Sequence, residues 1–144
     1  MSDAVVELAP LPPVLASAQA VAREEGLSYA GGVGPPEAWA LVQSGQAVLV
    51  DVRTAEERTF VGRVPGTLHV PWATGTSLTR NPRFVRELEA KVGTEDTVIL
   101  LCRSGKRSAL AAAAAAAVGF VRVFNLLEGF EGEIDGDGPR GRLD

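Results

Sequence analysis

The chain has 144 residues, enough for one domain with a hydrophobic core of its own. Hydrophobic residues make up 46% of the sequence and charged residues 22%, which excludes wholesale disorder. The 18 acidic and 14 basic residues give a formal net charge of −4. General nucleic-acid binding needs a basic surface, so we expect no nucleic-acid partner.

The N-terminus and the rare residues bear on location and redox chemistry. Asp3 and Glu7 stand where a secretory signal carries positive charge, and prolines soon interrupt the segment that follows. The longest apolar run, 109–118, is about half the length that spans a bilayer. We therefore expect a cytoplasmic protein with no membrane partner. Cys102 is the only cysteine and His69 the only histidine, so no intramolecular disulfide can form, and we expect neither a metal nor a cofactor.

The first 34 residues predict a helical arm and a glycine-rich linker. Residues 14–25 have a helical pattern that ends at Gly26, and the sequence Gly-Gly-Val-Gly-Pro-Pro at 31–36 predicts a loop. One apolar stripe of the helix consists of Val14, Ala18 and Val21. We expect this arm to pack back on its own domain.

Strands alternate with helices through the rest of the chain. We expect strands at 47–51, 68–70, 97–101 and 121–124, and helices at 36–43, from Thr54, at 81–91 and at 109–118. The apolar runs in the first and third of these strands are typical of a sheet buried on both faces. The pattern predicts an α/β fold, an open parallel sheet with helices on both faces. This domain spans 35–132, and residues 133–144 predict an irregular tail.

The loop after the strand at 97–101 carries the candidate chemistry. Cys102 to Ser108 join a buried strand to the start of a helix, which is where ligands bind in open α/β sheets. Gly105 permits the backbone conformations of a tight loop. Backbone N–H groups ahead of a helix can converge on one anion, and the helix dipole strengthens the attraction. A cysteine placed there is favoured in its nucleophilic thiolate form.

Three cations lie in this loop, although the chain as a whole is net negative. Arg103, Lys106 and Arg107 stand at a helix start, where positive charge opposes the helix dipole unless an anion is bound. Two simpler interpretations are a solvated helix start and a cysteine that serves as a small buried hydrophobe. The strand-end position and the clustered charge together favour a reactive Cys102 beside a site for a doubly charged oxyanion.

Asp51 ends the strand at 47–51, and Arg53 lies two residues further on, near the site. Their spacing predicts a structural ion pair that supports the loops beside the site. His69 lies on a short predicted strand, and we expect hydrogen bonds to satisfy it in a structural role.

Several segments, in order and at similar spacing, resemble the rhodanese-like sulfurtransferases over roughly 36–132. The matching segments are Asp51-Val52-Arg53 with Glu57, Gly62-Arg63-Val64-Pro65-Gly66-Thr67, Cys102–Ser108, and 119–129. The resemblance implies a rhodanese-like fold and a persulfide formed on Cys102. It also implies that the loop binds the donor and the persulfide, through Arg103, Ser104, Gly105, Lys106, Arg107 and Ser108.

The activity implied by the resemblance is transfer of sulfane sulfur from an anionic donor such as thiosulfate to a thiophilic acceptor, cyanide or a thiol. Mercaptopyruvate and a protein persulfide are alternative donors. A different hypothesis is a sulfur carrier or redox-sensing module that acts on a protein partner with little turnover. An inactive scaffold would lack Cys102. A cysteine phosphatase carries an arginine six residues after its cysteine, whereas this chain has Ser108 there.

Overall fold

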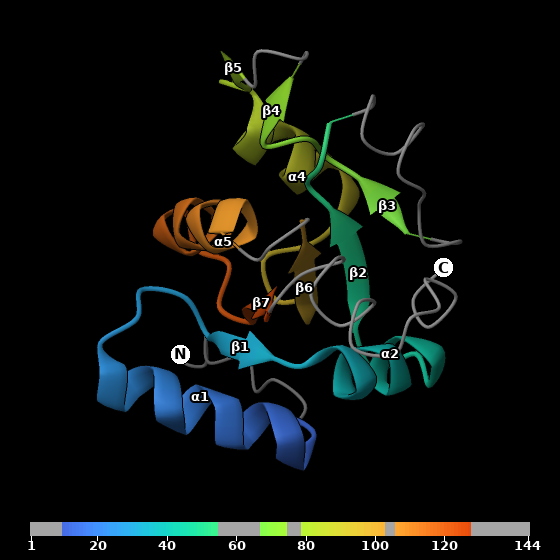
Figure 1. The fold of residues 1–144 in the computed structure, drawn as a ribbon, viewed down its shortest axis with the longest axis vertical. Helices are drawn as coiled ribbons and strands as arrows, with labels where there is room; N and C mark the ends of the chain where they lie inside the picture. The colour runs from blue at the N-terminus through green and yellow to red at the C-terminus, as the bar shows by residue number, and fades with distance from the viewer. Residues whose placement is uncertain (1–9, 55–66, 75–78, 103–105, 128–144) are drawn as a thin grey trace, which may run out of the picture.

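A parallel sheet of five short strands lies at the centre of the protein (Figure 1). The computed structural model describes residues 10–54, 67–74, 79–102 and 106–127. Every pairing in this sheet is parallel. In spatial order the strands are β1 (Gly31–Val33), β7 (Val123–Leu126), β6 (Val98–Leu101), β2 (Val48–Asp51) and β3 (Leu68–His69).

Helices cover both faces of the sheet, which confirms the predicted fold class. One face carries α1 (Pro13–Glu25) and α2 (Pro35–Gln43), and the other carries α4 (Phe84–Lys91) and α5 (Lys106–Ala117). None of the helices within the described ranges is long and apolar enough to cross a membrane.

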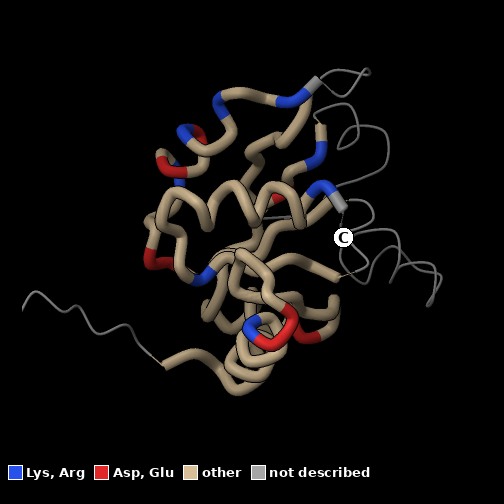
Figure 2. Tube along the Cα trace, turned by 90° about the vertical axis from the view of Figure 1, so that its left-hand side faces the viewer, with Lys and Arg blue, Asp and Glu red and all other residues tan. Residues whose placement is uncertain are grey.

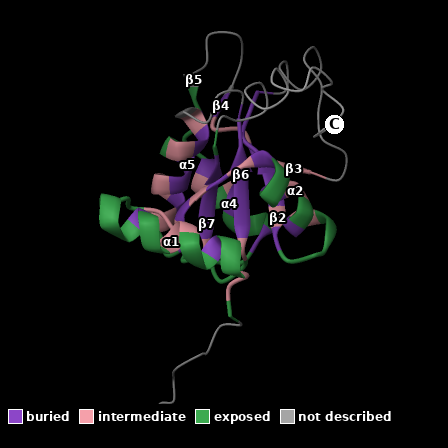
Figure 3. Ribbon diagram, turned by 60° about the horizontal axis from the view of Figure 1, so that its bottom comes forward, coloured by how far each residue is buried: buried purple, intermediate pink, exposed green. Residues whose placement is uncertain are grey.

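Side chains of β6 build the core on both faces, because successive residues of a strand point to opposite sides. Ile99 and Leu101 pack in the cluster under α1 and α2, while Val98 and Leu100 pack under α4 and α5. All four residues are completely buried, and the strands form the buried centre in Figure 3. This burial on both faces explains why the strand is apolar throughout.

The alanine-rich helix α5 comes close to the sheet. Its buried apolar residues include Ala111, Ala112 and Ala115, which pack in the cluster that contains Val98 and Leu100. Alanine combines a high helix propensity with a small side chain, so the helix can form and still approach the strands. The helix begins three residues before the predicted start at 109, and its first turn therefore includes Ser108.

The expected loop at 31–36 is wrong except at Gly34, because residues 31–33 form β1 and α2 begins at Pro35. Gly31 lies opposite Phe124 and Val33 opposite Leu126 in the ladder with β7. Helix α1 packs so closely here that a Cβ on Gly31 would lie 2.7 Å from the carbonyl oxygen of Ala18. Glycine at this position therefore permits a helix–strand contact, a use that sequence alone does not distinguish from a flexible loop. The expected packing of the helix on its own domain is confirmed.

The predicted apolar stripe of α1 is also wrong in two of its three residues. Val14 and Val21 are 37% and 50% exposed, whereas Leu15 and Ala22 are buried. Ala18 packs against the core cluster that contains Leu15. The two valines instead line a groove of about 580 Å³ beside α1, together with Leu27 and Leu127. The helix is apolar on more than one side, so its pattern did not specify which side would meet the sheet.

Replacing Leu15 with alanine is expected to lower the free energy of unfolding by about 2–5 kcal/mol, because Leu15 is completely buried between α1 and the sheet. The matched control is Val21→Ala on the exposed side of the same helix, which should change the free energy by less than about 0.5 kcal/mol. Urea unfolding of both variants measures the difference. Equal losses would contradict the observed orientation of α1.

Other boundaries differ from the sequence prediction by a few residues. Helix α4 begins at Phe84 instead of 81, after a turn in which the Asn81 side chain accepts a hydrogen bond from the Arg83 N–H at 3.0 Å. Strand β7 runs two residues later than expected, and Val121 is 51% exposed. The pair β4 (Ala73–Thr74) and β5 (Thr79–Arg80) is antiparallel and was not predicted, since each strand has two residues.

Three predicted features lie outside the described residues, in whole or nearly so. They are the helix after Thr54, the segment at 62–67 that carries part of the family resemblance, except for Thr67, and the tail at 133–144.

Candidate active site

The carboxyl ends of β2 and β6 bring the candidate residues to one edge of the sheet. Asp51 and Leu101 are partners in the parallel ladder, and the Val52 N–H donates to the Leu101 carbonyl at 2.8 Å. Cys102 follows Leu101 directly, while Arg53 follows Val52. The parallel register thus places the Asp51–Arg53 turn beside the cysteine, as the sequence indicated.

The Cys102 thiol is completely buried and contacts the first turn of α5. The backbone N–H of Ser108 donates to Cys102 Sγ at 3.3 Å, and the Ser108 hydroxyl lies 3.3 Å from the same sulfur. Helix α5 begins at Lys106, so these contacts come from the end of the helix where N–H groups lack intrahelical acceptors. The Ser108 N–H and the helix dipole favour negative charge on the sulfur.

Asn125 completes a polar chain behind the cysteine. The Ser108 hydroxyl donates to Asn125 Oδ1, and both side chains are buried. Asn125 lies in β7 between Phe124 and Leu126, which are buried apolar residues. Asn125 was not among the site residues predicted from the sequence. The signal that could have found it is an amide within an otherwise apolar buried strand, since such a group requires a hydrogen-bond partner.

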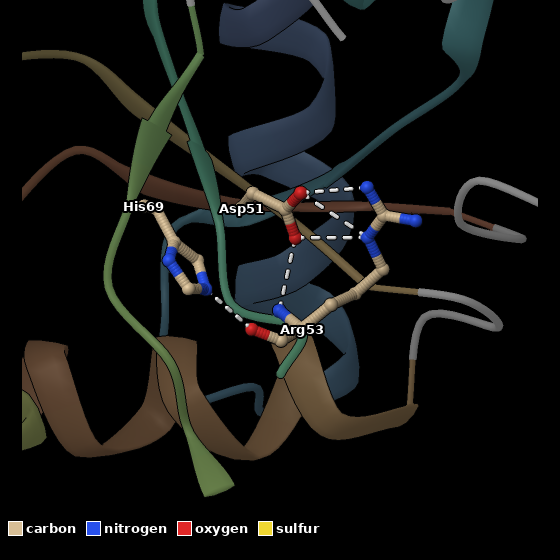
Figure 4. Close-up of polar contacts among 3 residues, drawn as sticks. All are labelled: Asp51, Arg53 and His69. Atoms are coloured by element: carbon tan, nitrogen blue, oxygen red, sulfur yellow. Dashed lines mark hydrogen bonds and ion pairs between the residues drawn. The ribbon is translucent and has the colours of Figure 1, made fainter. Parts of the chain in front are cut away.

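Asp51 and Arg53 form the predicted ion pair, and both side chains are completely buried (Figure 4). Arg53 donates from Nε to both carboxylate oxygens at 3.0 and 3.1 Å, and from a terminal guanidinium nitrogen to Oδ2 at 2.7 Å. The Arg53 backbone N–H also donates to Asp51 Oδ1 at 2.9 Å. The carboxylate therefore holds both the side chain and the backbone of Arg53, which fixes the turn after β2.

His69 contacts the same turn from the neighbouring strand β3. Its Nε2 lies 2.7 Å from the Arg53 carbonyl oxygen, so this nitrogen carries the proton and donates (Figure 4). The hydrogen bond agrees with the structural role predicted for this histidine.

The remaining candidate residues are only partly within the described structure. Arg103, Ser104 and Gly105 lie outside the described residues, and so does the side chain of Lys106. Arg107 is half-buried in the first turn of α5. Along the described trace, basic residues are interspersed with acidic ones, as Figure 2 shows. The donor-binding role of the loop therefore stays a prediction.

The fold and the site define an α/β protein with a cysteine at the junction of a central strand and a helix. A family model described as the rhodanese-like domain matches residues 34–133. The crystal structure of Rv0390 from M. tuberculosis is 42% identical, with a TM-score of 0.64 over 80% of this chain and 90% of that one. The human single-domain sulfurtransferase TSTD1 is 29% identical, with a TM-score of 0.56 over 72% of this chain and 95% of that one.

Curated relatives agree with this assignment. The chloroplastic thiosulfate sulfurtransferase 16 of Arabidopsis thaliana is 31% identical over 83 residues, which are 56% of this chain and 68% of that protein. The chain spans about half the length of two further plant relatives. It belongs to the rhodanese-like sulfurtransferase family.

Proposed function

We propose that this protein transfers sulfane sulfur from thiosulfate, or a related anionic donor, to a thiophilic acceptor through a persulfide on Cys102. The observation that carries the proposal is the position of Cys102 Sγ, which receives the Ser108 N–H and lies beside the Ser108 hydroxyl at the start of α5. The N–H bond and the start of the helix favour a thiolate, the form in which cysteine acts as a nucleophile.

The reaction has two displacement steps. The Cys102 thiolate attacks the outer sulfur of thiosulfate, a sulfur–sulfur bond forms on the protein, and the sulfur–sulfur bond of thiosulfate breaks to release sulfite with the electron pair. The acceptor, cyanide for example, then attacks the outer sulfur of the persulfide and leaves as thiocyanate. Cys102 returns to its thiolate form. No net oxidation or proton transfer is needed, so His69 has no task as a base.

The intact mass of the protein after exposure to thiosulfate tests this route. The reduced protein should gain the mass of one sulfur atom and lose it again on addition of cyanide. Cys102→Ser treated in parallel should gain nothing. If the wild-type protein gains no sulfur from thiosulfate, mercaptopyruvate or a low-molecular-weight persulfide, the proposal is wrong.

A sulfur carrier is distinguished from an enzyme by turnover. The enzyme should show ping-pong kinetics with thiosulfate and cyanide, because the first product leaves before the second substrate binds. A carrier would form the persulfide but release sulfur to cyanide slowly, and would release it faster to a protein thiol.

Charge reversal at Lys106 is expected to weaken donor binding, because Lys106 begins α5 beside the cysteine and thiosulfate carries two negative charges. Two unit charges about 10 Å apart in water interact by about 0.4 kcal/mol. Charge reversal against a doubly charged donor changes the product of the charges by four, so Lys106→Glu should raise the KM for thiosulfate by roughly tenfold or more. The rise should shrink at high ionic strength. The matched control is Lys91→Glu, at the exposed end of α4. An unchanged KM in Lys106→Glu would contradict electrostatic donor binding.

A further inference from the structure

We propose that Asn125 is a positioning residue for Cys102, and that its side-chain amide reverses its hydrogen bond with Ser108 when the thiol loses its proton. The reversal makes the Ser108 hydroxyl available to the thiolate. The proposal rests on the proposed function only in that Cys102 acts as a thiolate nucleophile.

In the described geometry the Ser108 hydroxyl is engaged with Asn125. The Ser108 hydroxyl donates its single proton to Asn125 Oδ1, so it presents an oxygen lone pair to Cys102 Sγ at 3.3 Å. A protonated thiol can donate across that contact. When the thiol is protonated, the two hydrogen bonds are therefore donated in the same direction, from the sulfur to Ser108 and from Ser108 to Asn125.

Loss of the thiol proton leaves two acceptors, the sulfur and Asn125 Oδ1, competing for the one hydroxyl proton of Ser108. A thiolate accepts hydrogen bonds only, so a serine lone pair facing it is repulsive, whereas a serine O–H facing it is a charge-assisted hydrogen bond. Ser108 has one hydroxyl proton and cannot give it to both neighbours. Both Ser108 and Asn125 are buried, so a polar group left unsatisfied is costly.

An amide at position 125 resolves the conflict because it carries both an acceptor and a donor. Rotation about its terminal torsion exchanges Oδ1 with Nδ2, and the two orientations are similar in shape. Nδ2 then donates to the Ser108 oxygen, and the hydroxyl proton turns to the sulfur. The Ser108 N–H bond to the sulfur remains in both states.

Other charged groups around the thiol are fixed in sign across this change. Asp51 and Arg53 lie on the adjoining end of β2 and are bonded to each other. Lys106 and Arg107 begin α5, and β7 contributes no charged residue. Asn125 is thus the residue of β7 that can respond to the charge of Cys102 by hydrogen bonding.

The test is a thiolate titration of two variants that match the amide in size. Asn125→Asp supplies an acceptor that holds the serine proton away from the sulfur, and it also adds negative charge. Asn125→Leu removes the competing acceptor, so the serine can turn to the sulfur freely. Cys102 is the only thiol in the chain, so thiolate absorbance and the rate of alkylation by iodoacetamide both report on it.

Opposite results are expected for the two variants. The midpoint of thiolate formation should rise by about one pH unit or more in Asn125→Asp. It should stay within about 0.3 unit of the wild-type midpoint, or fall, in Asn125→Leu, even though that variant loses stability. Equal upward shifts in both variants would show that Asn125 only packs against the site, and no shift in Asn125→Asp would also overturn the proposal.

A Ser108→Ala background separates the hydrogen-bond effect from the direct charge effect. Without the hydroxyl, Asn125→Asp can act on Cys102 only through its charge, so at least about half of the shift should disappear. An undiminished shift would contradict an action through Ser108. Because the titration uses no sulfur donor, a failure to form a persulfide would count against the proposed function and not against this role of Asn125.

Discussion

Cys102→Ser is expected to abolish sulfur transfer, with a loss of at least about four orders of magnitude in kcat/KM. A serine hydroxyl does not ionise near neutral pH. Among the described residues, none contacts the side chain at position 102 as a general base that would activate it. The two displacement steps both pass through the sulfur of Cys102, so no partial route remains. Initial rates of thiocyanate formation from thiosulfate and cyanide measure the loss.

The fold should tolerate this substitution. Serine is close to cysteine in size, and its hydroxyl can take the same bonds from the Ser108 N–H and with the Ser108 hydroxyl. The urea midpoint of Cys102→Ser should therefore lie near that of the wild-type protein. Residual transfer above about one per cent of the wild-type rate in a folded variant would mean that the sulfur is carried elsewhere.

Arg53→Met is expected to have the largest effect on stability. Arg53 and Asp51 are both completely buried, and the substitution leaves the carboxylate without the guanidinium that binds it through three hydrogen bonds. Removing one partner of a buried ion pair costs about 3–5 kcal/mol, because an uncompensated charge remains in a medium of low dielectric constant. Urea unfolding with a fixed m value gives the free energy directly.

A double variant separates the charge from the packing in this turn. Asp51→Asn combined with Arg53→Met removes both charges but keeps an oxygen at position 51 for the Arg53 backbone N–H. We expect it to recover about half or more of the stability lost by Arg53→Met. If the double variant is less stable than the single one, the buried charge is not the cause of the loss.

Local sequence patterns were sufficient for the class of fold and for the centre of the site. The apolar runs at 48–50 and 98–101 fit burial on both faces of a parallel sheet covered by helices, which is the observed arrangement. Cys102 could be placed at a strand–helix junction for the same reason. The Asp51–Arg53 pair could be predicted because its members are two residues apart, so the contact depends little on the rest of the fold.

Contacts between distant segments could not be predicted in this way. Whether Gly31 belongs to a loop or a strand depends on Phe124, which lies opposite it in β7. The buried side of α1 depends on the surface that the sheet offers to Leu15, since valines and alanines lie on several sides of the helix.

The contact of Asn125 with Ser108 is likewise one that the sequence alone does not predict. The sequence alone determined a parallel α/β domain with a cysteine at the start of a helix, because hydrophobic periodicity and strand–helix alternation are local properties. Only the tertiary structure decided that the Asn125 amide in β7 contacts Ser108 in α5, which lies 17 residues earlier in the chain. This contact lies behind Cys102. That contact depends on the packing of α5 against β7, and hydrogen bonds between elements are fixed only when the elements pack.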